Sequence, residues 1–178
     1  MSSFLSNPLA RTARPGAAWA NVGCVDSYPD VDDGSSVGQQ RLCGGKHVAG
    51  CRVFHVPRTD GSKATEIAID DWKDPEAGGD AKDQVMVFRY KGQLVAINHE
   101  CPHSSFPLSR GVPFDVEDFG VVLSAGISCP KHGWSFDLHT GRADRGSYRL
   151  QVWELQERPG TRGEGSRDVW VRRKQKMG

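Results

Sequence analysis

The sequence lacks a long hydrophobic run and an excess of charge of either sign. No stretch of its 178 residues approaches the roughly 18 consecutive apolar residues that a membrane-spanning helix needs. Its 23 Lys and Arg residues almost balance its 22 Asp and Glu residues, which leaves a formal net charge of +1. A chain with so weak an overall field is not expected to attract nucleic acid or a membrane surface. We therefore predict no membrane span and no nucleic-acid partner.

The sequence also lacks the cysteine pattern of a disulfide framework. Its five cysteines are odd in number in a chain of intermediate size, which argues against such a framework and indicates a reducing compartment. We therefore place the chain inside the cell, with the cytoplasm as the preferred location. The N-terminal segment has no acidic residue before Asp26 and contains Arg11 and Arg14, which makes a mitochondrial transit peptide the alternative. Pro8 and Pro15 interrupt the amphipathic helix that such a peptide needs.

Gly and Pro are abundant, with 21 and 10 residues, and no window of about a dozen residues has a helical period. Strands are predicted over residues 51–57, 66–72, 85–90, 93–97, 134–138, 148–155 and 168–171. Lys91 and Gly92 form the turn of a predicted hairpin, and a single helical turn is expected near 114–119. We predict one antiparallel all-β domain over residues 19–173, with a flexible segment at 1–18 and a basic tail at 174–178.

Two short clusters of Cys and His dominate the rest of the sequence. The first is Cys101-Pro-His103, soon after a predicted strand, and the second is Cys129-Pro-Lys-His132, shortly before one. Each cluster supplies one thiol and one imidazole on a tight turn, so that two ligands reach a metal with little additional ordering entropy. Two Cys and two His can hold a tetrahedral Zn²⁺ or the two irons of a [2Fe–2S] cluster.

These two boxes resemble the paired signature of Rieske iron–sulfur proteins. The resemblance implies one [2Fe–2S] cluster and an antiparallel β-sandwich with an inserted cluster-binding subdomain made of two loops, at about 98–141. It implies that Cys101 and Cys129 ligate the inner iron. It also implies that His103 and His132 ligate the outer, more exposed iron. A structural zinc-binding module is the alternative, although C-x-H is an uncommon zinc knuckle.

The chain departs from the Rieske subunits of quinol-oxidising respiratory complexes, which carry a second Cys in each box. Phe106 and Lys131 stand at those positions, so that no disulfide can brace the cluster. Trp134 and Phe136 replace two hydroxyl side chains that those proteins direct towards the cluster. Because fewer hydrogen bonds to sulfur lower the reduction potential, we expect it at the lower end of the Rieske range of about −150 to +300 mV.

The resemblance therefore narrows to soluble Rieske-type ferredoxins of the low-potential branch, and segment 104–128 is similar to the longer loop of eukaryotic ferredoxin-like members. A catalytic oxygenase subunit would add a mononuclear iron site of two His and a carboxylate, but His139 is the single histidine after His132. We predict a one-electron carrier between a donor and an acceptor protein, without catalytic residues of its own. The alternative is the electron-supplying component of a multi-chain oxygenase or reductase.

The spacing Cys43-x₃-His47-x₃-Cys51 would permit a second metal site. Since Cys51 opens a predicted strand, we expect a buried core thiol there, and another at Cys24. His99 is expected to be exposed at a strand end rather than to act as a further ligand.

The inserted residues 111–126 are expected either to cover one side of the cluster or to form a surface for a partner. Lys131, Arg110 and Arg145 are candidates for positive charges near the cluster that would attract an acidic redox partner. His139 is expected at a surface turn, outside the site.

Overall fold

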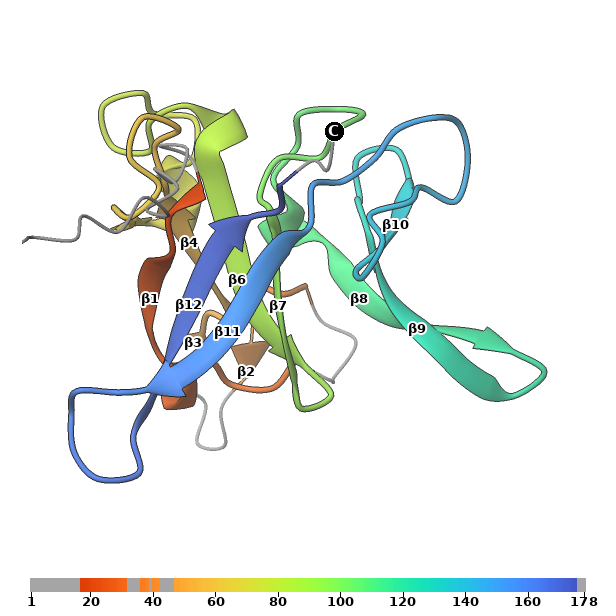
Figure 1. The fold of residues 1–178 in the computed structure, drawn as a ribbon. Helices are drawn as coiled ribbons and strands as arrows, with labels where there is room; N and C mark the ends of the chain where they lie inside the picture. Colours follow the sequence, from red (N-terminus) through yellow and green to blue (C-terminus); the bar gives the residue numbers. More distant parts are fainter. Residues whose placement is uncertain (1–16, 32–35, 39, 42–46, 176–178) are drawn as a thin grey trace, which may run out of the picture.

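Antiparallel strands joined by short turns form nearly all of the regular structure (Figure 1). The computed structural model describes residues 17–31, 36–38, 40–41 and 47–175. In chain order the strands are β1 (Ala20–Cys24), β2 (Gln40–Arg41), β3 (His47–Val48), β4 (Cys51–His55), β5 (Thr65–Ile67), β6 (Gln84–Tyr90), β7 (Gln93–Asn98), β8 (Val112–Asp118), β9 (Val121–Ser128), β10 (Ser135–Asp137), β11 (Trp153–Pro159) and β12 (Arg167–Arg173). Single turns of 3-10 helix lie between them: η2 (Val25–Ser27), η3 (Ile69–Asp71), η4 (Ala81–Asp83) and η5 (Leu108–Arg110).

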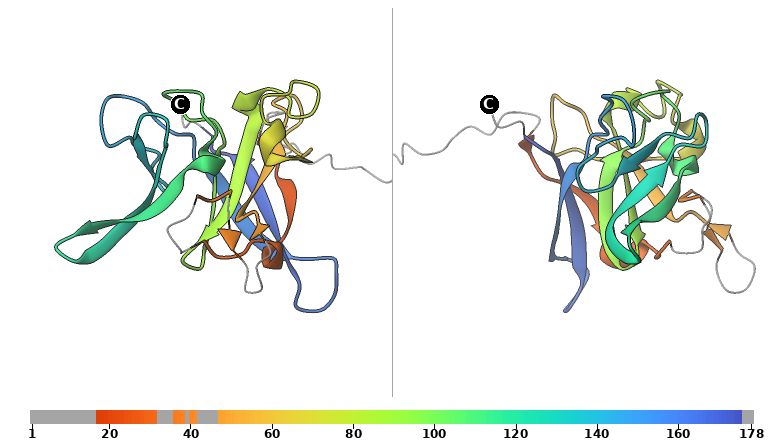
Figure 2. Two further views of the ribbon diagram at one scale, coloured as in Figure 1. Left: turned by 180° about the vertical axis from the view of Figure 1, so that it is seen from behind. Right: turned by 90° about the vertical axis from the view of Figure 1, so that its right-hand side faces the viewer.

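Two of the sheets face each other and form a sandwich (Figures 1 and 2). One has the strand order β5-β4-β6-β7 and the other the order β1-β12-β11, and all their pairings are antiparallel. The space between them is filled by buried side chains, which include Ala20, Val22, Phe54, Val85, Val87, Trp153, Val169 and Val171. A bridge between Ile97 and Val152 connects the two sheets at one edge. The predicted all-β antiparallel sandwich is therefore confirmed.

Strand β6 is buried on both of its faces, which explains its run of apolar residues. Val85 and Val87 pack inside the sandwich, whereas Met86 and Phe88 point into a second core on the opposite face of the sheet. Full burial of each such side chain contributes about 1.5–3 kcal/mol. The second core continues into the inserted segment through Cys101, Leu108, Ile127, Cys129, Phe136 and Leu138. The four-stranded sheet therefore packs against both Cys-His boxes through this second core.

The hairpin between β6 and β7 turns at Lys91 and Gly92, as predicted. Their φ values are 47° and 79°, both in the left-handed region. A two-residue turn with two positive φ values matches the right-handed twist of paired strands, and Gly accepts that conformation without a steric penalty. The turn thereby sets the register of β7, from whose end the first box begins.

The inserted segment forms a lobe beside the sandwich, with its own sheet in the order β10-β9-β8. The hairpin β8–β9 projects from this lobe away from the sandwich (Figure 2). The helical turn predicted at 114–119 is wrong, because these residues lie largely in β8 and pair with β9, so that cross-strand hydrogen bonds override a weak local preference. The outer part of the β8–β9 hairpin, residues 117–123, is exposed and points away from the boxes. This part of the inserted segment therefore does not cover the boxes.

Two of the predicted strands have different bounds in the structure. Of residues 66–72, only the first two belong to β5, because its ladder with β4 stops at Ile67 opposite Val53. The strand predicted at 148–155 begins instead at Trp153, which lies opposite Arg173, the last residue of β12. The ladder of β5 ends with its partner strand, whereas residues 148–152 make single backbone contacts with other segments, such as the bridge between Ile97 and Val152, rather than a continuous ladder.

The cysteines outside the boxes are core residues where the structure describes them. Cys24 and Cys51 are buried, as predicted, and burial raises the pKa of the Cys51 thiol to about 12. Cys43, and with it the alternative of a second metal site, lies outside the described residues, as do 1–16 and 176–178. In the part of the chain that the structure describes, no helix has the length and apolar character needed to span a membrane.

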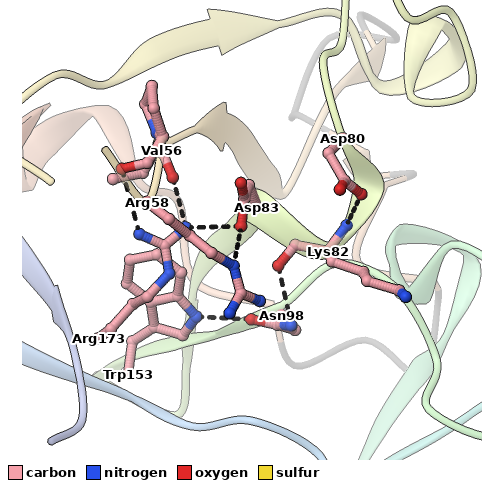
Figure 3. A network of polar contacts seen from close by, with 9 residues as sticks. Val56, Arg58, Asp80, Lys82, Asp83, Asn98, Trp153 and Arg173 are labelled. Atoms are coloured by element: carbon pink, nitrogen blue, oxygen red, sulfur yellow. Dashed lines mark hydrogen bonds and ion pairs between the residues drawn. The ribbon is translucent and has the colours of Figure 1, made fainter. Parts of the chain in front are cut away.

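A polar network joins β11 and β12 to segments of the four-stranded sheet and the turns beside it (Figure 3). Asp83 accepts hydrogen bonds from Arg58 Nε at 2.8 Å and from Arg173 Nη2 at 3.2 Å. The guanidinium carbon of Arg173 lies 4.6 Å from the Trp153 ring centroid. Trp153 Nε1 donates to Asn98 Oδ1 at 2.7 Å. Because Asn98 ends β7, the network holds the strand end from which the first box starts.

Candidate metal centre

The structure brings the four residues of the two boxes together. Cys101 and Cys129 are 0% and 1% exposed and belong to the second core. The imidazole rings of His103 and His132 lie with their centroids 5.2 Å apart. His103 is half-buried, whereas His132 is exposed. The thiols therefore lie inside the protein and the imidazoles lie towards its surface.

The two boxes have the same backbone hydrogen-bond pattern. In each box the Cys carbonyl accepts from the N–H four residues later, at 2.9 Å in both, and the Cys N–H donates to the carbonyl five residues later, at 2.9 and 2.7 Å. The residue four positions after each Cys has a left-handed φ, 52° at Ser105 and 71° at Gly133. Gly favours this conformation, whereas Ser is held in it by the surrounding structure. Each box is therefore a preformed turn that needs little ordering to present its ligands.

The two thiols are close enough to influence each other. Burial raises the pKa of the Cys129 thiol, and the neighbouring Cys101 adds to the increase because two thiolates would repel. The Lys131 N–H and the Ser104 hydroxyl act in the opposite direction, since each donates a hydrogen bond to the sulfur. Thiols bind metals as thiolates, and the positive charge of a metal would take the place of the protons.

One buried nitrogen at the site has no protein partner. Nδ1 of His103 makes no hydrogen bond among the described residues, and such an atom costs about 1–3 kcal/mol unless an ion or water binds it. Two thiols and two imidazoles fit the two irons of a Rieske cluster, because each iron takes two protein ligands. The unpartnered Nδ1 of His103 is an atom that such an iron would bind.

Aromatic side chains cover one of the two imidazoles. The Trp134 ring stacks on His103 with a centroid distance of 4.4 Å and an interplanar angle of 22°. The Tyr148 ring meets His103 edge-on at 5.2 Å and Trp134 at 5.1 Å. Tyr148 was not among the predicted site residues, because it lies in the loop after β10 and no nearby motif marks it. The two imidazoles therefore differ, because His103 is shielded and His132 is open.

A hydroxyl group reaches one of the sulfurs from the other box. Ser104 Oγ lies 3.6 Å from Cys129 Sγ. The sequence has no hydroxyl group at Trp134 or Phe136, the two positions at which high-potential Rieske proteins carry one. The contact crosses from the first box to the second, so that only the folded chain reveals it.

The expectation that His99 is exposed is wrong. The side chain is 0% exposed, with Nδ1 3.0 Å from Gln84 Oε1 and Nε2 2.8 Å from Ser109 Oγ. Burial lowers the pKa of His99 to about 4, so that the ring is neutral at pH 7. The Gln84 amide nitrogen already donates to two backbone carbonyls, so its oxygen accepts from Nδ1–H and Nε2 accepts from the Ser109 hydroxyl. His99 therefore links β6 to the first box.

The three predicted cations do lie at the boxes. The Lys131 ammonium nitrogen and the Arg110 guanidinium carbon lie 5.9 Å and 6.0 Å from the centroid of the Phe106 ring. Arg145 Nη2 donates to a backbone carbonyl of the second box at 2.6 Å. His139 is exposed beyond β10, at a surface turn as expected.

Comparison with known proteins identifies the family. The sequence model of the Rieske [2Fe-2S] domain matches residues 62–154, which is just over half of the chain and includes both boxes. The chain belongs to the Rieske [2Fe-2S] domain family. As a Rieske protein it binds one [2Fe–2S] cluster and carries electrons.

Two solved structures are similar to this Rieske protein. The putative NADH-dependent nitrite reductase small subunit from Mycobacterium tuberculosis is 17% identical, with 86% of this chain and 95% of that chain covered and a TM-score of 0.44. The ferredoxin of carbazole 1,9a-dioxygenase from Nocardioides aromaticivorans IC177 is 27% identical, with 55% and 80% covered and a TM-score of 0.37. No curated protein gave a significant match.

Proposed function

We propose that Cys101 and Cys129 ligate one iron of the cluster and that His103 and His132 ligate the other. Two turns with the same hydrogen-bond pattern bring two buried thiols and two imidazoles together, and this convergence is the observation that carries the proposal. When bound, the cluster accepts and returns one electron. The domain that holds it spans residues 19–173, with the boxes in a cluster-binding part at about 98–141.

The residues around the boxes exclude water from one side of the site and leave the other side open. Cys101 and Cys129 lie in the apolar core, and Trp134 and Tyr148 cover His103. His132 is exposed, so that a docked protein can contact it directly. Electrons therefore enter and leave at the His132 edge.

The surroundings of the site also favour a moderate reduction potential. Neutral imidazole ligands raise the potential of a [2Fe–2S] cluster above that of plant-type ferredoxins. The second box carries no hydroxyl at Trp134 or Phe136, and Ser104 supplies one hydroxyl contact to sulfur instead. We therefore propose a potential in the lower half of the range of about −150 to +300 mV.

The chain exchanges electrons with a separate donor and a separate acceptor protein, and we place it in the cytoplasm. The free thiols in the described residues, at Cys24, Cys51, Cys101 and Cys129, suit a reducing compartment. The alternative is to supply electrons to a multi-chain oxygenase or reductase, the kind of system named for the two similar structures. Co-purification with a flavin reductase or a non-haem iron subunit would support that alternative.

The proposal is tested by the absorption spectrum of aerobically purified protein and by EPR after anaerobic reduction with dithionite. We expect a red-brown protein with a rhombic signal of low average g, as for a cluster with mixed Cys and His ligands. A colourless, EPR-silent protein that holds stoichiometric zinc, even after cluster reconstitution, would overturn electron transfer and support the zinc-binding module.

Variants with matched controls test the ligand assignment. Cys101→Ala and Cys129→Ala are expected to abolish the cluster absorption, because each removes one thiolate ligand. Cys24→Ala and Cys51→Ala remove buried thiols outside the boxes and are expected to keep the spectrum. Loss of the cluster in the control variants, together with its retention in either box variant, would contradict the assignment.

Histidine replacement supplies an independent measurement. His103→Cys and His132→Cys are each expected to lower the reduction potential, because a thiolate adds negative charge to the site. His139→Cys, on the exposed turn beyond β10, is expected to leave the potential unchanged. An unchanged redox titration in both box variants would show that these imidazoles are not ligands.

A further inference from the structure

Three positive side chains contact residues of the two boxes or their immediate neighbours. Lys131 precedes His132, is exposed, and has its ammonium nitrogen 5.9 Å from the Phe106 ring centroid. The Arg110 guanidinium carbon lies 6.0 Å from the same ring, so both cations approach the first box. Arg145 Nη2 donates to the carbonyl of the residue after His132 at 2.6 Å. Cations from three separate segments therefore lie beside the two boxes.

The charge of these segments differs from that of the whole chain. Residues 101–110, 129–134 and 142–149 contain five Lys or Arg residues and one Asp, whereas the complete chain has a net charge of +1. Two carboxylates approach the cations. Asp144 lies 3.6 Å from Arg145, and Asp70 lies 4.0 Å from Arg110. All four side chains are 45% exposed or more, and exposed pairs of this kind interact weakly. A local positive field therefore persists on a nearly neutral protein.

We infer that this surface docks a redox partner whose contact face is acidic. The inference rests on the proposed function, since His132 matters as an electron route only if it is a ligand. Opposite charges raise the rate of encounter and align two proteins. Because the net charge of the chain is small, the attraction comes from the surface around His132 and selects the orientation in which that edge meets the partner.

The test uses two small oxidants of opposite charge and the cluster-loaded protein after reduction with dithionite. The reduced protein passes one electron to hexacyanoferrate(III), which becomes hexacyanoferrate(II), or to hexaamminecobalt(III), which yields cobalt(II). Stopped-flow absorption gives each second-order rate constant. Raising the ionic strength from about 0.01 M to about 0.2 M is expected to slow the reaction with the anion and to accelerate that with the cation.

Charge-reversal variants locate the field. Lys131→Glu is expected to slow the reaction with hexacyanoferrate(III) about tenfold at an ionic strength of about 0.01 M and much less at about 0.2 M. Arg145→Gln is a second variant, with a smaller effect in the same direction. Arg162→Glu is the control, because it makes the same change in net charge in the exposed loop between β11 and β12, far from the boxes (Figure 1). It is expected to change the rate less than about twofold.

An acidic polypeptide serves as the protein-sized probe. Poly-L-glutamate is expected to slow the reaction of the unmodified protein with hexacyanoferrate(III) at low ionic strength, and to have little effect on Lys131→Glu. Equal rate changes in Lys131→Glu and Arg162→Glu, or a faster reaction with the anion as salt is added, would overturn the inference. A protein without a cluster, or one that reduces neither oxidant, would overturn the proposed function instead.

Discussion

Ser104 and Ser105 are neighbours in the first box, but only Ser104 contacts a sulfur. Its Oγ lies 3.6 Å from Cys129 Sγ, whereas Ser105 is exposed in the left-handed turn position. A hydrogen bond to a thiolate sulfur stabilises the reduced, more negative state of the site. This contact therefore supplies part of what the absent hydroxyl groups at Trp134 and Phe136 would have supplied.

Replacing Ser104 by Ala should lower the reduction potential while the cluster stays bound. Loss of one hydrogen bond to sulfur corresponds to a change on the order of tens of millivolts. The matched control is Ser105→Ala, which removes an exposed hydroxyl one residue away and is expected to leave the potential unchanged. Spectroelectrochemical titration of both variants measures the effect, and equal potentials would show that the Ser104 contact is without influence.

The His99 ring connects two elements of the fold by hydrogen bonds. It joins Gln84 on β6 to Ser109 in η5 through two buried hydrogen bonds. Ser109→Ala would leave Nε2 of His99 buried without its partner, and we expect the free energy of unfolding to fall by about 1–3 kcal/mol. Denaturant titration followed by far-UV circular dichroism measures this change. Ser147→Ala, in an exposed loop, is the control and should alter stability by less than about 0.5 kcal/mol.

At the scale of the element, the hairpin β8–β9 carries an unusual turn. Phe119 and Gly120 have φ values of 49° and 78°, which is the backbone of a two-residue hairpin with two left-handed positions. Phe119 is 100% exposed, and Val121, Val122 and Leu123 beside it are more than half exposed. A bulky residue pays a steric penalty in this conformation and gains no burial in return.

Phe119→Asn should therefore stabilise the protein. Asn followed by Gly is the preferred sequence for such a turn, and we expect the free energy of unfolding to rise by about 0.5–1 kcal/mol. The absorption and EPR spectra should not change, because the outer half of the hairpin points away from the boxes. Thermal or denaturant unfolding measures the gain. A loss of stability would instead indicate that the Phe119 ring is buried when the protein is in solution.

At the scale of the whole molecule, one sheet serves two cores. Alternate side chains of strand β6 pack inside the sandwich and against the boxes. The cluster-binding lobe and the sandwich are therefore built on the same sheet. The polar network around Asp83 closes the sandwich at the end where β7 leads into the first box (Figure 3). Stability of the sandwich and order of the first box are therefore linked.

Arg173 tests this link between the sheets. Arg173→Met keeps an apolar stem over Trp153 but removes the donor to Asp83 and to the carbonyl of Val56, and both partners lie in a largely buried network. We expect a loss of about 2–3 kcal/mol in the free energy of unfolding. Arg167→Met breaks an exposed pair with Glu157 and should cost less than about 1 kcal/mol. Similar losses in the two variants would contradict a special role for the network.

The fold class, the position of the β6–β7 hairpin and the two boxes could all be predicted from the amino-acid sequence. Each depends on residues close together in the chain. Lys91 and Gly92 are adjacent and set a turn by their own backbone preferences. The spacing of Cys and His within each box is short enough for one turn to fix both side chains. Family membership, which the match over 62–154 shows, follows from the same local patterns.

The arrangement of the side chains around the boxes could not be predicted in this way, because it depends on contacts made only in the folded chain. The contact of Ser104 with Cys129, the burial of His99 against Gln84 and the cover of Tyr148 over His103 each join segments that are distant in sequence. The strand that replaced the helical turn predicted at 114–119 also depends on a partner, because β9, the next strand of the same hairpin, supplies its cross-strand hydrogen bonds. Periodicity and turn chemistry describe a chain's own backbone, whereas the partner of a polar side chain is chosen by whichever segment folds against it.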